Sequence, residues 1–208
     1  MEIQLCDVGK RFRYEWIIKK FSYTFNHQQH YALLGPNGSG KSTLMKILSG
    51  HLSPSAGKIK FLLKNPSKDI PLDSVYRQIS FASPYIELVE EFTLTEMLDF
   101  HQRFKSFQPG IDNQTIIDIM RFEKSRHKEV RFFSSGMKQR LKLALAICAD
   151  TPLLLLDEPT TNLDAQGAVW FREILQIFGQ NRTVVVATNV DADHSFFCDQ
   201  QINILDYK

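Results

Sequence analysis

The sequence is poor in cysteine and nearly balanced in charge, and each of these features excludes a class of protein. Its three cysteines, Cys6, Cys148 and Cys198, are too far apart for a disulfide framework or a zinc site, so we expect reduced thiols packed in the core of an intracellular protein. The 25 basic and 23 acidic residues leave a net charge of +2. This is not the basic excess with which nucleic-acid-binding proteins neutralise phosphates, so we expect no nucleic-acid partner.

Long hydrophobic runs are also missing. No apolar run approaches the roughly 20 residues of a membrane-spanning helix, and the first residues lack the basic and apolar regions of a signal peptide. We expect a cytoplasmic chain, so any association with a membrane must pass through a partner protein. Internal repeats and low-complexity segments are absent as well, and 208 residues suit one domain with a small insertion.

Short apolar segments alternate with helical patterns along most of the chain. Residues 153–156 and 183–187 are almost wholly apolar, which is typical of strands in a parallel sheet that is covered on both faces. Residues 2–8 and 21–25 alternate apolar and polar side chains, so we expect an antiparallel edge there. Further strands are expected at 30–34, 58–63, 75–82 and 201–205, and helices at 41–49, 136–149 and 166–178. The predicted fold class is α/β.

Residues 85–135 differ in character and are interpreted as a helical insertion. Helical patterns cover residues 93–104 and 112–122, and Thr93 with Glu96 has the pattern of a capping box. We attribute the acidic residues of this region to a solvated face, with a docking surface as the alternative. The division leaves residues 1–84 and 150–208 as the core of a single domain over residues 1–208, with 64–75 as a surface loop.

A glycine-rich turn follows the expected strand at 30–34 and opens the helix at 41–49. It consists of Gly35, Pro36, Asn37, Gly38, Ser39, Gly40, Lys41, Ser42 and Thr43. Backbone N–H groups converge in such a turn, and the helix N-terminus adds partial positive charge, so the turn is predicted to bind phosphates. Lys41 would reach the β- and γ-phosphates of a nucleotide, and the Ser42 hydroxyl would bind Mg²⁺.

Two carboxylates end the apolar strand at 153–156. Ligands of open α/β sheets collect at the carboxyl ends of strands, so Asp157 is expected beside the phosphate-binding turn as a second anchor for Mg²⁺. Glu158 stands one residue further along. It is the candidate general base that orients, or takes a proton from, a water molecule attacking the γ-phosphate. The alternative is a polar pair that only ends a strand.

The chain at this point resembles the ATP-binding-cassette ATPases. Besides the turn and the acidic pair, residues 134–140 (SSGMKQR) resemble the signature loop of that family, and residues 161–164 (TNLD) match its D-loop. The resemblance extends over essentially the whole chain. It implies a P-loop NTPase with a mostly parallel central sheet, an antiparallel β edge subdomain and an inserted helical subdomain. It also implies two subunits that enclose two ATP molecules, each held by the turn of one subunit and the signature loop of the other.

The resemblance assigns further residues to the site. Ser134 and Gly136 would bind the γ-phosphate of the ATP held by the facing subunit, because they stand at a helix N-terminus whose N–H groups are free. Asp164 would lie at the same subunit boundary, although it could equally cap the helix that follows it. Phe12 aligns with the ring on which the family stacks adenine, with Tyr14 and Trp16 as alternatives.

Three positions depart from the family pattern. Ser83 and Pro84 stand where a glutamine usually completes the Mg²⁺ and water shell. Asn189 stands where a histidine usually contacts the γ-phosphate, and asparagine donates only a neutral hydrogen bond. His194 is assigned to the loop beyond it. The signature itself has Ser135 and Met137 where glycine and glutamine are common. These changes put the rate of hydrolysis in question more than the binding of ATP.

The resemblance implies an ATP-hydrolysing subunit, peripheral on the inner face of the cell membrane and paired with a separately encoded transmembrane permease. A second copy of the chain, or a related ATPase subunit, would complete the dimer, and the short chain resembles subunits of export systems. One alternative is a non-transport ATPase of the same fold. Another is a cassette that holds ATP, hydrolyses it weakly and works beside a more active partner.

Overall fold

The structure is a computed structural model that describes residues 1–64, 67–189 and 197–208. Contacts within the chain divide it into two compact units. One unit contains residues 1–81, 152–158 and 181–208, and the other contains residues 82–151 and 159–180. We call them the sheet unit and the helical unit. The helix at residues 165–178 groups with the helical unit, in addition to the insertion that the sequence predicts.

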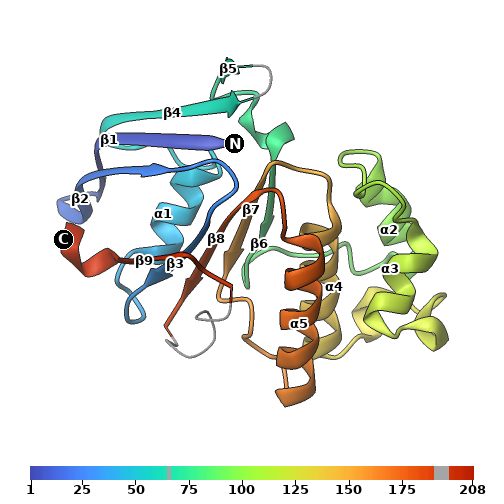
Figure 1. Ribbon diagram of the computed structural model, residues 1–208. Helices are drawn as coiled ribbons and strands as arrows, with labels where there is room; N and C mark the ends of the chain where they lie inside the picture. Colours follow the sequence, from blue (N-terminus) through green and yellow to red (C-terminus); the bar gives the residue numbers. More distant parts are fainter. Residues whose placement is uncertain (65–66, 190–196) are drawn as a thin grey trace. The chain divides into compact units, whose positions relative to one another are not determined.

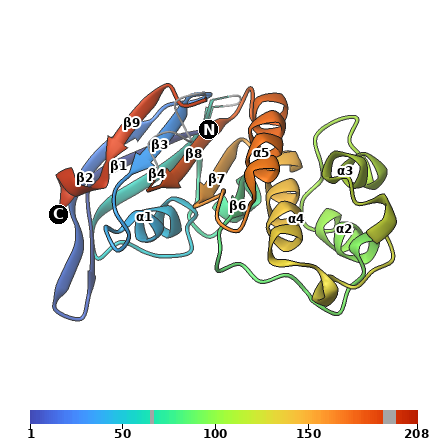
Figure 2. The same cartoon turned by 90° about the horizontal axis from the view of Figure 1, so that it is seen from below.

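A four-stranded antiparallel sheet carries the N-terminal part of the sheet unit (Figure 1). Its order is β2-β1-β4-β5, with β1 at Glu2–Phe12, β2 at Glu15–Phe25, β4 at Ala56–Lys64 and β5 at Ser67–Ile70. The antiparallel edge predicted from the first strands is therefore present. β1 and β2 extend further than predicted, because Arg13 has a positive φ of 53° and closes a tight hairpin. Figure 2 shows this hairpin reaching beyond the rest of its sheet.

A five-stranded sheet forms the second layer of this unit, in the order β6-β7-β8-β3-β9. Its strands are β3 at His30–Leu34, β6 at Ile79–Ala82, β7 at Leu153–Asp157, β8 at Thr183–Thr188 and β9 at Gln200–Asn203. β3 pairs in parallel with β8 and β9, and β7 pairs in parallel with β8. Every residue of β7 and β8 is buried, as their apolar sequences predicted. The predicted parallel sheet is confirmed.

One hydrophobic core joins the two sheets to α1, at Lys41–Leu48. The helix presents Leu44, Met45, Ile47 and Leu48 to it, and side chains from strands of both sheets contribute the rest. Burial of these side chains stabilises the unit by on the order of 2 kcal/mol for each large one. α1 begins at Lys41, within the last residues of the glycine-rich turn. Packing of the helix against the core therefore fixes the position of the turn.

The helical unit consists of α2 at Leu94–Gln102, α3 at Asn113–Met120, α4 at Ser135–Cys148 and α5 at Ala165–Phe178. Thr93 and Glu96 form the predicted capping box at α2, each side chain bonded to the backbone N–H of the other. Short 3₁₀ turns at Glu123–Ser125 and Val130–Phe132 connect α3 to α4. α3 and α5 both pack on α4. Within the described residues, no helix is long and apolar enough to cross a bilayer.

Several expectations were wrong in detail. The strand expected at 201–205 ends at Asn203, because Ile204–Tyr207 form a 3₁₀ turn. Residues 64–75 are not only a loop, because β5 lies in them and pairs with β4. The strand expected at 75–82 begins at Ile79, because Val75–Gln78 form a 3₁₀ turn. Cys6 is exposed instead of buried, since it points away from the core on β1, although Cys148 is buried as predicted. Cys198 is only partly buried, and none of the three cysteines forms a disulfide within the described residues.

Candidate functional site

The register of the parallel strands brings the predicted site of the sheet unit together. Leu34, the last residue of β3, pairs with Thr188, the last residue of β8. Asp157, the last residue of β7, pairs with Ala187. The glycine-rich turn, the acidic pair and Asn189 therefore leave the sheet at one edge, which is the carboxyl edge where ligands of α/β sheets bind.

The glycines of the turn hold conformations that other residues rarely adopt. Gly38 and Gly40 have φ values of 75° and 104°. A Cβ on Gly40 would stand 2.9 Å from Cγ2 of Ile17, so β2 packs directly against the turn. Gly40 caps α1 without a side-chain hydrogen bond, and the first N–H groups of the helix are therefore not occupied by a capping side chain. This leaves amide donors for an anion.

Lys41 lies folded into the turn and pairs with the candidate base. Its Nζ donates to the carbonyl oxygens of Gly35, at 2.8 Å, and Pro36, at 3.3 Å. It also lies 3.2 Å from Oε1 of Glu158. The Lys41 side chain is only 5% exposed and that of Glu158 is 22% exposed. A cation buried to this extent needs an anion beside it, and Glu158 supplies that anion.

Glu158 is held in an unusual backbone conformation. Its φ is 47°, in the left-handed region that non-glycine residues seldom adopt, and its N–H donates to the carbonyl oxygen of Ala187 at 2.8 Å. Strained conformations of this kind concentrate at functional sites, where the surrounding structure enforces them. The turn after β7 thus aims the Glu158 side chain at Lys41.

The residues proposed for Mg²⁺ fit a divalent cation. Asp157 is 2% exposed, and the Ser42 hydroxyl hydrogen-bonds to its carboxylate. Its Oδ1 is buried and has no hydrogen-bond partner among the described residues. The pKa of Asp157 is raised, chiefly by burial and also by the charge of Glu158, although the Ser42 hydrogen bond and the charge of Lys41 act in the opposite direction. A hydroxyl and an open carboxylate oxygen at the phosphate-binding turn form a donor set that Mg²⁺ favours.

Asn189 contacts the turn. Its Nδ2 donates to Oδ1 of Asn37 at 3.2 Å, so the side chain lies over the tip of the turn. His194 falls outside the described residues. Ser83, at the other departure from the family pattern, belongs to the helical unit, is 4% exposed and accepts a hydrogen bond from the N–H of Tyr85.

The aromatic side chains of the hairpin have different surroundings. Phe12 is 48% exposed at the end of β1, and Nζ of Lys10 lies 5.3 Å from its ring centre. The Trp16 ring packs over Gly9 and beneath the guanidinium of Arg11. Tyr14, at the hairpin tip, is 97% exposed. Phe12 and Tyr14 therefore both keep accessible faces. Phe12 also pairs with Glu15 of β2, the strand whose Ile17 packs against Gly40 of the turn.

The signature residues form a second cluster, within the helical unit. Ser134 caps α4 by accepting a hydrogen bond from the N–H of Met137 at 3.2 Å. Gly136 packs against the loop before α5, because a Cβ there would stand 3.2 Å from the carbonyl oxygen of Asn162. Asp164 caps α5 by accepting from the N–H of Gly167 at 2.7 Å. Of the two roles open to Asp164 in the sequence, the structure therefore contains the cap.

Sequence reasoning missed two residues of this second cluster. Gln139 is 3% exposed, and its Nε2 donates to the carbonyl oxygen of Pro159 at 2.9 Å. The Arg140 guanidinium lies 3.8 Å from Oδ1 of Asp164 and over the ring of Trp170. A polar residue that falls among the apolar positions of a helix was the available signal for Gln139.

The comparisons with known proteins all indicate the same family. The family model described as ABC transporter matches residues 18–161. Nod factor export ATP-binding protein I of Rhizobium johnstonii is 32% identical over 203 residues, which cover 95% of this chain and 64% of the relative. An uncharacterized ABC transporter ATP-binding protein of Bacillus subtilis, YxlF, is 32% identical over 196 residues, which cover 93% and 64%. The chain thus spans less than two thirds of the length of these relatives.

Solved structures show the same fold at lower sequence identity. A putative ABC transporter ATP-binding protein of Pyrococcus furiosus matches with a TM-score of 0.83 at 20% identity, over 100% of both chains. The bacterial ABC transporter cassette MJ0796, solved as a dimer, matches with a TM-score of 0.80 at 20% identity, over 98% of this chain and 95% of that chain. The predicted fold class is therefore confirmed.

We predict that Lys41→Ala lowers the affinity for ATP by at least about 100-fold, because the phosphates lose the only cationic side chain predicted to reach them. Titration calorimetry with ATP and Mg²⁺ measures this change. Lys60→Ala, an exposed lysine on β4, is the matched control and should bind as the wild type does. Equal ATP affinity of Lys41→Ala and the wild type would remove the assignment of the turn.

Proposed function

The chain belongs to the ABC transporter family, and on that premise we propose that it binds and hydrolyses ATP as the subunit that powers a membrane transporter through closure of a cassette dimer. One observation carries this function. Lys41 lies 3.2 Å from Glu158 at the edge of the sheet where Asp157 and Ser42 also meet. A phosphate-binding cation, a candidate base and a candidate metal site are thus within one site.

The residues of the sheet unit have complementary tasks in this proposal. The amides of the turn and Lys41 bind the phosphates, and the exposed face of Phe12 stacks on the adenine. Ser42 and Asp157 would hold Mg²⁺, which neutralises phosphate charge when bound. Glu158 accepts a proton from the attacking water, or orients it, once the phosphates have drawn Lys41 away. Asn189 donates a neutral hydrogen bond near the γ-phosphate.

The helical unit completes the site of a second subunit. Ser134 and Gly136 at the start of α4 offer N–H groups and a hydroxyl to a γ-phosphate that is bound by the other copy. The γ-phosphate is then the differential contact between closed and open dimers, so ATP closes the pair and hydrolysis releases it. Structures of MJ0796 as a dimer support this arrangement by likeness of fold.

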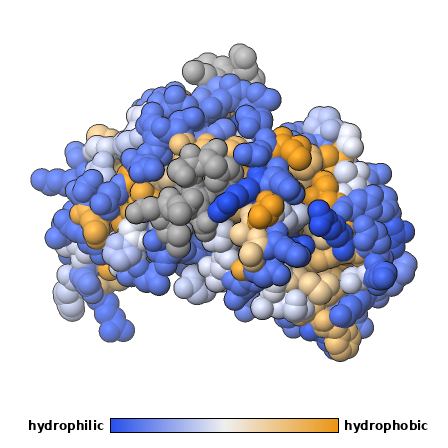
Figure 3. All heavy atoms as spheres, turned by 60° about the horizontal axis from the view of Figure 1, so that its bottom comes forward, coloured by the Kyte–Doolittle hydropathy of each residue, from blue (hydrophilic) through white to orange (hydrophobic). Residues whose placement is uncertain are grey.

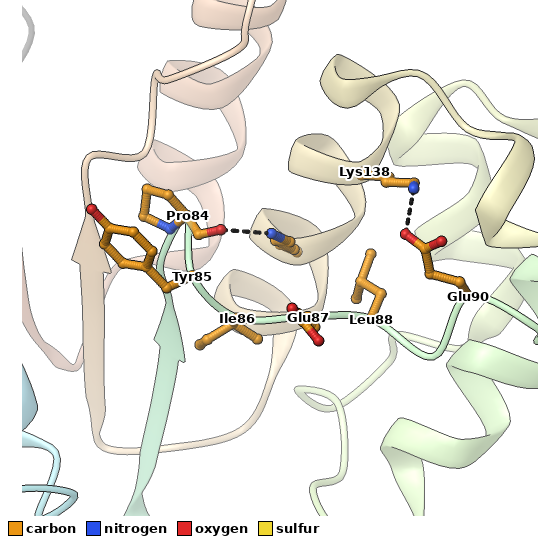
Figure 4. A pocket seen from close by; sticks show the side chains of 8 residues that line it. Pro84, Tyr85, Ile86, Glu87, Leu88, Glu90 and Lys138 are labelled. Carbon is orange, nitrogen blue, oxygen red and sulfur yellow. Dashed lines mark hydrogen bonds and ion pairs between the residues drawn. The ribbon is translucent and has the colours of Figure 1, made fainter.

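A transmembrane partner is proposed to bind the helical unit, within residues 85–125. A hollow of about 440 Å³ lies along Pro84–Glu90 on one side and Lys138 and Lys142 of α4 on the other (Figure 4). Tyr85 is 76% exposed there, although Nζ of Lys142 fixes the loop by donating to the carbonyl oxygen of Pro84. On the face drawn in Figure 3, hydrophobic residues form separate patches among hydrophilic ones.

A weakly hydrolysing cassette is the second candidate, and one contact favours it. Nδ2 of Asn189 is already bonded to Asn37 in the turn, and an amide cannot gain the charge that a histidine carries when protonated. In that case the chain binds ATP and closes the dimer, while a related partner subunit performs most of the hydrolysis.

Glu158→Gln is expected to trap an ATP-bound dimer. The change removes the base but leaves the turn, and it also frees Lys41 from its ion pair, so binding is not weakened while hydrolysis stops. Gel filtration with ATP and Mg²⁺ should move most of the protein from the position of one 24.0 kDa chain to that of two. Glu123→Gln, on the surface of the helical unit, should not. A Glu158→Gln protein that elutes only as a monomer would count against the closed dimer.

The proposed membrane partner can be located by photo-crosslinking. A photoreactive phenylalanine in place of Tyr85 should form an adduct with a transmembrane protein when the full-length chain is irradiated in native membranes. The same residue in place of Tyr14, an even more exposed tyrosine of the sheet unit, should not. Adducts that form from residue 14 and not from residue 85 would place the partner elsewhere.

The second candidate predicts that Asn189→His raises the turnover number for ATP by about tenfold, because an imidazole can donate a charged hydrogen bond to the γ-phosphate. Steady-state phosphate release by the purified chain measures it. Asn189→Gln keeps the amide and is the matched control, with turnover at or below that of the wild type. Equal rates for the two variants would show that residue 189 does not limit hydrolysis.

A further inference from the structure

Gln139 is the one polar residue among the buried residues of α4. Eight residues of this helix are buried, and the others are leucine, alanine, isoleucine and cysteine. A buried amide costs free energy unless it is hydrogen-bonded, so packing alone would favour an apolar side chain at this position. Gln139 is bonded, since its Nε2 donates to the carbonyl oxygen of Pro159 at 2.9 Å. The hydrogen bond therefore indicates that the Gln139 amide holds the backbone of Pro159.

Pro159 begins the loop that links the candidate base to α5. It directly follows Glu158, whose φ of 47° is sustained by its surroundings. The loop continues through Asn162, which also has a positive φ of 66°, and ends at the α5 cap, Asp164. Two residues with left-handed conformations in a short loop need external contacts to hold them, because their own backbone preference is for other conformations.

α4 supplies those contacts from its first two turns. Gln139 holds Pro159 at the start of the loop, Gly136 packs on the carbonyl of Asn162 in the middle, and Arg140 lies 3.8 Å from Asp164 at the end. The same helix starts with Ser134 and carries Gly136, which are proposed to bind the ATP of the facing subunit. One rigid helix thus joins the signature to the loop that leaves the base.

We propose that Gln139 is a positioning residue for hydrolysis. Its amide fixes the backbone immediately after Glu158 to the signature helix, so that the base is aligned when the signature contacts ATP of the second subunit. The inference rests on the proposed function for its catalytic consequence, whereas the structural link between Gln139 and the loop stands independently of it.

Gln139→Met tests the proposal, because methionine has a similar length and keeps the position filled but cannot donate the bond. We expect the turnover number for ATP to fall by about tenfold or more, with KM within about twofold, since binding by the turn is unaffected. We also expect faster hydrogen exchange of the Leu163 amide, which donates to the carbonyl oxygen of Thr160 within the loop.

Gln108→Met is the matched control. The Gln108 amide also braces backbone carbonyls of the helical unit, those of Ile147 at 3.1 Å and Phe178 at 2.9 Å, but these are the last turns of α4 and α5. Its loss should cost similar stability and leave both turnover and Leu163 exchange unchanged. Gln139→Asn, which keeps an amide that is too short to reach Pro159, should behave like Gln139→Met and serves if the methionine variant does not fold.

The outcomes separate this proposal from the proposed function. Equal turnover losses in the Gln139→Met and Gln108→Met proteins, or unchanged exchange at Leu163 in the Gln139 variants, would overturn the positioning role. Absence of ATP binding by the wild type would instead refute the proposed function, and the exchange of Leu163 would still decide whether Gln139 holds the loop. If the wild type binds ATP without measurable turnover, the hydrogen exchange of Leu163 likewise decides whether Gln139 holds the loop.

Discussion

Hydrogen bonding between β8 and its two neighbours fixes where three distant segments leave the central sheet. The pairing of Leu34 with Thr188, and of Asp157 with Ala187, ends β3, β7 and β8 at one level. A shift of any strand by two residues would move its terminal side chains by more than 6 Å along the sheet and separate the turn from the acids. The turn that is predicted to bind phosphates thus lies beside the acids because the register of the buried, apolar strands is strongly specified.

The charge balance of the site follows from that arrangement. Lys41 is nearly buried, and its charge is compensated by Glu158 and by two carbonyl oxygens of the turn. A polyphosphate that reaches Lys41 competes with Glu158 for the same cation, so the arrival of the ligand and the release of the base are linked by electrostatics. Asp157 lies close enough for the charges of Lys41 and Glu158 to act on its pKa, and it keeps an open oxygen with the hydroxyl of Ser42 beside it.

The departures from the family pattern also have local physical consequences. Asn189 contacts Asn37, so this position touches the turn through neutral groups only. Ser83 uses its hydroxyl to accept a bond from the N–H of Tyr85, and Pro84 after it has no N–H to offer. Lys41, Ser42 and Asp157, which are proposed to bind phosphate and metal, are not among the altered positions. Under the proposed function, these departures would therefore affect the alignment and activation of water more than the capture of the nucleotide.

The sequence by itself determined the chemical inventory and the local elements. The glycine-rich turn, the acidic pair after an apolar strand, and the capping box of Thr93 and Glu96 are patterns between near neighbours, and short-range backbone and side-chain preferences fix them. Only the tertiary structure decided that Lys41 pairs with Glu158, that Asn189 bonds to Asn37 and that Gln139 holds Pro159. Such contacts join segments far apart in the chain, and they depend on strand register and helix packing, which no local pattern encodes.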